Sequence, residues 1–140
     1  MVLDSDTLSE LSRGAPRVTA RARAYLLQHG RLTITSVTVF ERLRGYHAAI
    51  RNGKPFQAQL AAFETLVATC IVLPFDSDAA DRAARIWAAL QRKEQRAIGD
   101  IFIAAIASIR SLPLVTRNRR DFAPMAAFPF AGLQLEDWSK

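Results

Sequence analysis

The sequence predicts an α/β fold in which a mainly parallel sheet is covered by helices on both faces. Short β-branched or aliphatic runs alternate along the chain with longer segments in which apolar residues recur at helical spacing. Half of the 140 residues are hydrophobic, which is enough to bury one core and favours a single domain over residues 1–140. No apolar run reaches the roughly 18 residues of a membrane span, so no segment is expected in a membrane.

The elements follow from local signals, taken in chain order. Residues 2–3 form a short apolar strand that ends at Asp4, and a short helix is predicted over 7–12, stopped by Gly14 and Pro16. By the same signals, helices are predicted over 18–29, 38–46, 55–67, 76–93 and 100–110, strands over 32–35, 71–73, 114–116 and 133–136, and a polar loop or short helix over 117–125. Because strands and helices alternate, the strands are expected to run parallel.

Two of the predicted helices carry apolar residues at helical spacing, which are expected to face the core. They are Phe56, Leu60, Phe63 and Val67 in one helix, and Ala79, Ala83, Ile86 and Leu90 in the other. Trp87 and Trp138 are predicted to pack against the rest of the protein rather than to stack on bases.

The chain is basic, with a formal net charge of +6 and a pI of about 10.4. Such a balance favours a polyanionic partner: nucleic acid, an acidic protein or a membrane surface. Most of the positive charge is arginine, whose planar fork suits phosphate, although genomic base composition also explains arginine in place of lysine. Cys70 is the only cysteine, which excludes an internal disulfide. Residues 1–11 lack the features of a signal peptide, so a cytoplasmic protein is expected.

Acidic and amide side chains gather where the predicted strands end. Asp4 ends the first strand, Glu41 lies in the first turn after the second, and Asn118 follows the strand over 114–116. Asp100 opens a helix that can point to the same edge. Because ligands bind at the carboxyl ends of parallel strands, we expect these side chains to converge from distant parts of the chain.

A cluster of this composition suits Mg²⁺. Carboxylates without basic partners repel one another, and a cation relieves the repulsion. Mg²⁺ prefers oxygen ligands, retains several waters and usually takes one or two carboxylates together with substrate phosphate. Such a site can activate water and stabilise the leaving oxygen of a phosphodiester, so the pattern favours a nuclease.

Each acid also has a purely structural interpretation. Asp4 and Asp6 could cap the helix that follows them, and Glu41 stands three residues after Thr38, which is the spacing of a capping box. Asp100 at a helix start would gain from the helix macrodipole. No single acid is therefore a specific signal, and it is their joint placement at one edge that favours the metal site.

The segment 116–121 is dense in arginine beside the same edge. Arg117 and Arg119, together with Thr116 and Arg120, are candidate contacts for RNA phosphates. A solvated loop or a surface for an acidic partner explains them as well. Other site classes find little support: two histidines and one cysteine are too few for zinc, and there is neither a glycine-rich phosphate loop nor a serine nucleophile elbow.

Four stretches resemble segments of one known family: Val2–Leu11, Thr33–Gly45, Ile98–Ala105 and Leu114–Phe122. They contain, in order, an aspartate before a short helix, a strand leading into a helix with a glutamate, an aspartate before an Ile-Ala-Ala helix, and a strand followed by an asparagine. In this order they resemble the PIN-domain ribonucleases of the VapC type, the toxins of toxin–antitoxin pairs. The likeness runs over the whole chain and implies a three-layer α/β/α domain.

By this resemblance, Asp4 and Asp100 would be the main Mg²⁺ ligands, with Mn²⁺ as an alternative ion, and Glu41 would act through waters or a second metal. Asn118 matches the fourth acidic position, where the family has Asp or Asn, and would orient water or phosphate. The chain opens Asp-Ser-Asp where the family commonly has Asp-Thr-Asn. Whether the additional Asp6 reaches the metal stays open.

The resemblance also implies a function and partners. The function is that of a Mg²⁺-dependent endoribonuclease toxin, and the partners are RNA, a second copy in a homodimer, and a small antitoxin that can insert an arginine into the acidic site. No base-reading motif identifies the RNA.

Two alternatives stay open. Asp4-Ser5-Asp6 mimics the Asp-x-Asp opening of haloacid-dehalogenase-like phosphohydrolases, whose first aspartate is a nucleophile, although their lysine and late acidic pair have no clear match here. The neutral Asn118 leaves room for a catalytically inert, PIN-like binding module.

Overall fold

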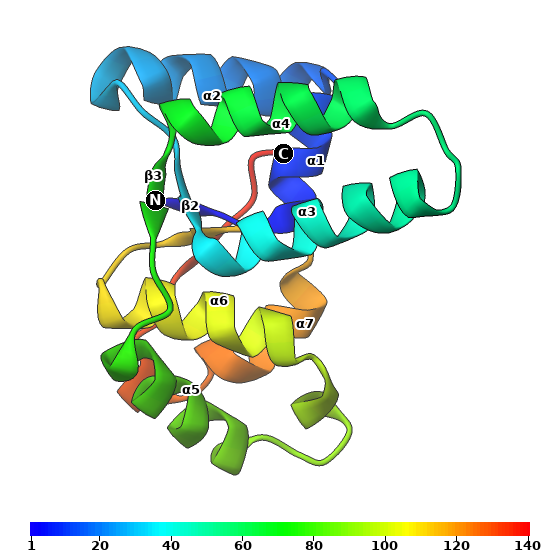
Figure 1. The fold of residues 1–140 in the computed structure, drawn as a ribbon. Coiled ribbons are helices and arrows are strands. Elements are labelled where there is room, and N and C mark those ends of the chain that lie inside the picture. The colour runs from blue at the N-terminus through cyan, green and yellow to red at the C-terminus, as the bar shows by residue number, and fades with distance from the viewer.

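The computed structural model describes all residues, 1–140, as seven α-helices, two 3-10 helices and five short strands (Figure 1). The strands are β1 (Val2–Leu3), β2 (Thr33–Thr35), β3 (Ile71–Leu73), β4 (Leu114–Val115) and β5 (Leu135–Glu136). The helices are α1 (Ser5–Ser12), α2 (Pro16–His29), α3 (Ser36–Arg51), α4 (Gln57–Thr69), α5 (Ser77–Ala89), η1 (Glu94–Arg96), α6 (Ile98–Ile109), α7 (Arg119–Ala126) and η2 (Pro129–Ala131). None of the helices is long and apolar enough to cross a membrane.

All paired strands run parallel, as predicted. One hydrogen-bonded ladder has the order β1–β4–β5, and β2 pairs with β3 in a second ladder. β1 also contacts β2, so the spatial order is β3–β2–β1–β4–β5. The carboxyl ends of β1 and β4 lie at one edge, and a hydrogen bond of 3.5 Å from Ser5 to Thr38 brings the start of α3 to the same edge. We call this the carboxyl edge.

Side chains of the central strands alternate between two cores. Val2 and Leu114 belong to one hydrophobic cluster, whereas their neighbours Leu3 and Val115 belong to the other. The first cluster includes residues of α5, α6 and α7, and the second includes residues of α1, α2 and α4. Figure 1 shows these two groups of helices on opposite sides of the strands. The predicted three-layer α/β/α arrangement is therefore confirmed.

The helix α6 lies inside the molecule and carries Asp100 in its first turn. Seven of its residues are buried, in keeping with a helix that is apolar on almost every side. It packs extensively on α5 and also contacts α3 and α7. Its first turn is thereby held rigidly against α3, the helix that carries Glu41.

Several local predictions were wrong. Pro16 begins α2 instead of only ending the preceding helix, because the fixed φ of proline suits a first helical turn. Of the four apolar residues predicted to face the core in and before α4, Phe63 is buried, whereas Phe56, Leu60 and Val67 are only half-buried. Trp138 is buried as predicted, but Trp87 is 45% exposed on the outer side of α5.

Candidate active site

Asp4 directly follows β1 and is 3% exposed. The backbone N–H of Thr7 donates to its Oδ1 at 2.8 Å, so Asp4 is the N-cap of α1, and the hydroxyl of Thr116 donates to its Oδ2 at 2.5 Å. Burial raises the pKa of Asp4, and these hydrogen bonds act in the opposite direction. The capping interpretation is thus confirmed for Asp4. Each oxygen still keeps a lone pair for another partner.

Thr116 and Asn118 support the aspartate at the end of β4. Thr116 is fully buried, and while it donates to Asp4 it accepts the backbone N–H of Asn118 at 2.9 Å. Because this hydroxyl is buried and already acts as both donor and acceptor, it cannot contact RNA as predicted. Thr116 instead holds the carboxylate of Asp4 in position. The side-chain amide of Asn118 donates to Asp121 at 2.7 Å, beside the same edge.

Glu41 is not a helix cap. The N-cap of α3 is Thr35, whose hydroxyl accepts the backbone N–H of Thr38 at 3.1 Å, so the capping-box interpretation of Thr38 and Glu41 was wrong. The carboxylate instead reaches across to α1, where the hydroxyl of Ser5 donates to its Oε1 at 2.8 Å. Glu41 is therefore held beside the residue that follows Asp4.

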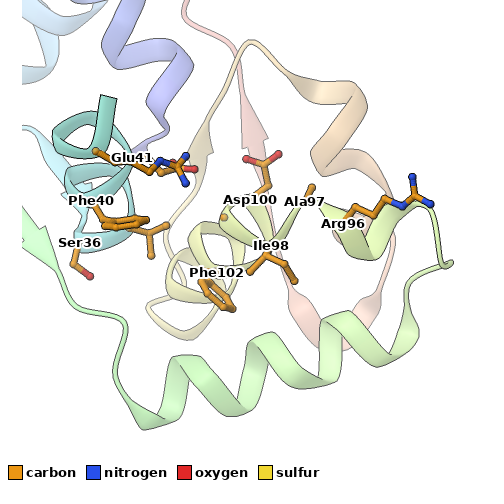
Figure 2. Close-up of a pocket in the computed structure, with 11 residues that line it drawn as sticks. Ser36, Phe40, Glu41, Arg96, Ala97, Ile98, Asp100 and Phe102 are labelled. Carbon is orange, nitrogen blue, oxygen red and sulfur yellow. The ribbon is translucent and has the colours of Figure 1, made fainter. Parts of the chain in front are cut away.

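Asp100 stands in the first turn of α6, with its carboxylate near that of Glu41 (Figure 2). Burial raises its pKa to about 7, and the negative charges of Glu41, Asp121, Asp4 and Asp6 act in the same direction. Acids from the end of β1 and from α1, α3 and α7 are thus near enough for their charges to act on Asp100. We call Asp4, Glu41 and Asp100 the three-acid site.

Two residues that support the site were not found by sequence reasoning. Ser5 holds Glu41, and Gly99 makes room for it: a Cβ atom at Gly99 would lie 2.5 Å from Oε2 of Glu41. Both contacts join elements distant in sequence, so no local pattern marks them. The only hint of this support in the sequence is that a glycine directly precedes Asp100.

The predicted arginines lie beside the three-acid site. Arg117 is exposed and forms an ion pair of 3.0 Å with Glu10, which also pairs with Arg13. Arg119 donates weakly to the backbone carbonyl of Leu135 at 3.5 Å and is otherwise exposed. Asp6, Arg117 and Asn118 line one small polar hollow, so Asp6 faces the arginine segment.

The three-acid site fits a magnesium ion. None of its carboxylates forms an ion pair with a basic side chain. The pKa of Asp100 is raised first by burial and then by the negative charges of its neighbours. No group of three or more acidic, histidine or cysteine side chains forms a ready-made cage. Mg²⁺ needs no such cage, since it usually takes one or two carboxylates and keeps waters. Asp4 and Asp100 could supply those carboxylates.

A larger hollow of about 620 Å³ adjoins the three-acid site and includes Glu41 and Asp100 in its lining (Figure 2). We call it the α3–α6 hollow, because it lies between α3 and the segment from η1 to the first turns of α6. Its remaining lining residues are Ser36, Val37, Phe40, Arg44, Arg96, Ala97, Ile98, Gly99 and Phe102.

Comparison with known proteins is consistent with this geometry. The model of the PIN domain family matches residues 1–127, a range that contains the three-acid site and Asn118. The chain belongs to the PIN-domain family. This PIN domain is 32% identical over 114 residues to the tRNA(fMet)-specific endonuclease VapC of Salmonella typhimurium, covering 80% of this chain and 79% of that protein. It is 38% identical over 96 residues to ribonuclease VapC5 of Mycobacterium tuberculosis, covering 68% and 69%.

Solved structures show the same relationship. The PIN domain superposes on a chain of the DNA-bound VapBC structure from Salmonella typhimurium with a TM-score of 0.74 and 30% identity, over 98% of this chain and 96% of that chain. The resemblance to VapC-type PIN domains, inferred from four sequence stretches, is confirmed.

Proposed function

We propose that this PIN domain is a Mg²⁺-dependent endoribonuclease and the toxin of a toxin–antitoxin pair. The observation that carries the proposal is the placement of Asp4, Glu41 and Asp100 at one edge without any basic partner. Burial, with the charges of Glu41 and Asp4 adding to it, raises the pKa of Asp100 to about 7. The names of its relatives, an endonuclease and a ribonuclease, support the same reaction class.

The residues of the three-acid site would divide the work. Asp4 and Asp100 would hold the metal, and Glu41 would act through a bound water. When bound, Mg²⁺ would lower the pKa of an attacking water and offset the charge of the scissile phosphate. Thr116 keeps Asp4 in place, and Ser5 keeps Glu41 in place.

The neighbouring residues would handle the substrate. Asn118 would orient water or phosphate at the edge of the three-acid site. The exposed Arg117 and Arg119 would bind RNA phosphates, Arg117 after exchanging its ion pair with Glu10 for a phosphate.

Cleavage of RNA by purified variants tests the proposal. Asp4→Asn and Asp100→Asn preserve shape and remove charge, so each should lower the cleavage rate by about 100-fold or more. Asp78→Asn, an exposed aspartate in the first turn of α5, is the matched control and should cleave like the wild type. Initiator tRNA is the first substrate to try, because the Salmonella relative is named for it. Wild-type rates in Asp100→Asn would reject the site.

The proposed partners are a small antitoxin and a second copy of the chain. The solved VapBC structure supports the antitoxin, and the net charge of +6 suits an acidic segment as well as RNA. Co-expression with the product of the neighbouring reading frame should suppress cleavage and give a stable complex, and light scattering on the isolated chain would determine its mass.

The alternative functions gain no support. A nucleophilic Asp4, as in haloacid-dehalogenase-like phosphohydrolases, would work together with a lysine. No lysine lines the α3–α6 hollow or the polar hollow beside Asp6. Nothing in the three-acid site favours an inert module.

A further inference from the structure

The α3–α6 hollow exposes apolar and aromatic surface at the edge of the three-acid site. Phe40 on α3 is 59% exposed, Ile98 is also exposed, and Phe102 is partly buried beneath them. In Figure 2 the three side chains lie on one side of Glu41 and Asp100. Phe102 packs against Phe75 and the core, whereas Phe40 and Ile98 stay exposed, so the two exposed side chains indicate a binding site.

Two arginines complete the α3–α6 hollow. The guanidinium of Arg44 lies 5.3 Å from the ring centroid of Phe40, and Arg96 approaches from η1. Both are exposed, and neither is among the arginines that form ion pairs with carboxylates. An aromatic ring and two free guanidinium groups therefore stand next to the three-acid site.

This combination selects one kind of occupant. An unpaired nucleobase stacks on aromatic or guanidinium planes, and its phosphates pair with arginine. The volume of about 620 Å³ lies in the usual range of small-molecule sites. RNA offers both a base for the ring of Phe40 and phosphates for the two arginines, and a metal bound at the three-acid site would offset the repulsion between its phosphates and the carboxylates of Glu41 and Asp100.

We propose that the α3–α6 hollow is a nucleobase subsite, in which Phe40 stacks on an unpaired base of RNA adjacent to the scissile phosphate and Arg44 and Arg96 bind the flanking phosphates. This inference rests on the proposed ribonuclease function and adds to it the residues that would hold one base beside the scissile phosphate. A base bound in this hollow would fix which phosphate of the RNA strand lies at the three-acid site.

Binding of defined oligomers tests the subsite. In the presence of Ca²⁺, the full chain is titrated into two fluorescein-labelled octamers, whose integrity is checked on gels. One carries bases and is either all-uridylate or all-adenylate, whichever binds better. The other is an abasic ribose-phosphate oligomer. The wild type should bind the better base-containing octamer about 5- to 100-fold more tightly than the abasic one, the range expected for base–aromatic stacking. Phe40→Ala should lose this preference and Phe40→Trp should keep it.

Two matched controls accompany the variants. Phe130→Ala removes another exposed phenylalanine, which lies outside the α3–α6 hollow, and it should bind like the wild type. Arg44→Gln should weaken the binding of both octamers by a similar factor. Arg51, an exposed arginine at the end of the same helix, is the control, and Arg51→Gln should leave the binding of both octamers unchanged.

The contrary outcomes are distinguishable. If the wild type cleaves RNA but Phe40→Ala binds both octamers as Phe130→Ala does, the subsite is rejected and the ribonuclease function stands. The same holds if the wild type binds both octamers equally. A change of oligomeric mass in Phe40→Ala would show that the hollow joins two copies instead. A wild type that neither binds nor cleaves RNA would reject both proposals.

Discussion

Gly99 lies directly beneath the carboxylate of Glu41: a Cβ atom on Gly99 would come within 2.5 Å of Oε2 and 3.3 Å of Cδ of that side chain. No other glycine in the chain has a neighbour within 4 Å of its missing Cβ. The glycine therefore lets Glu41 settle over the first turn of α6, where its charge acts on Asp100.

Gly99→Ala should separate stability from metal binding. Alanine favours the helix by up to about 1 kcal/mol, and the only obstacle is the end of the Glu41 side chain, so the fold should survive with equal or higher stability. Displacing the carboxylate should weaken Mg²⁺ binding by about 10-fold. Thermal unfolding and calorimetry measure the two effects. Gly45→Ala on α3 meets nothing within 4 Å and should leave Mg²⁺ binding unchanged.

Ser5→Ala should lower RNA cleavage by about 10-fold through loss of the hydrogen bond that holds Glu41. Ser5→Thr keeps the hydroxyl and should retain most of the activity. Steady-state cleavage rates at saturating Mg²⁺ test the pair. Equal losses in both variants would show that the hydroxyl has no positioning role.

Asp100 should make the metal-free protein less stable as the pH rises. Its pKa is raised to about 7 in the folded chain, so between pH 4 and 7 the folded state holds a proton that the unfolded state has lost. Stability from this group is therefore full below about pH 4 and is lost as the pH rises through about 7.

Thermal unfolding of Asp100→Asn in EDTA checks this sign. The variant should be more stable than the wild type at pH 8, by on the order of 1–2 kcal/mol once solvent screening is allowed for, and the two should converge near pH 4. A variant that is less stable at pH 8 would contradict the assignment.

Thr116→Val should destabilise the fold by about 1–3 kcal/mol, since it leaves a buried oxygen of Asp4 and the backbone N–H of Asn118 without their partner. Mg²⁺ affinity should fall as well, because Asp4 loses its anchor. Thr65→Val, an exposed threonine that bonds only to the carbonyl of Ala61, is the control and should change stability by a few tenths of a kcal/mol at most. Denaturant unfolding resolves the difference.

The sequence predicted the parts of the site that depend on local signals. Asp4 and Asp100 could be placed because a strand end and a helix start are marked by nearby residues, and alternation of elements then brings parallel strand ends together. Glu41 was placed at the right edge, and its alternative interpretation as part of a capping box was wrong, because α3 begins earlier than predicted, with Thr35 instead of Thr38 as its N-cap.

The contacts that tune the site could not be predicted in this way. Ser5 reaches Glu41 only because α1 and α3 pack side by side, and Gly99 matters only where α6 meets α3. Thr116 was a candidate RNA contact because it lies beside the arginines, yet it directly follows β4, the middle strand of its ladder, and is fully buried. These are properties of tertiary packing, which no local pattern encodes.

Calorimetry of Mg²⁺ binding at pH 7, in two buffers of different ionisation enthalpy, tests most directly whether the three-acid site binds the ion. If the three-acid site holds the ion through Asp100, the wild type should bind Mg²⁺ and release about half a proton, as expected for a group with a pKa of about 7, while Asp100→Asn should lose both signals. Absence of binding at millimolar Mg²⁺, or unchanged binding by Asp100→Asn, would contradict this assignment.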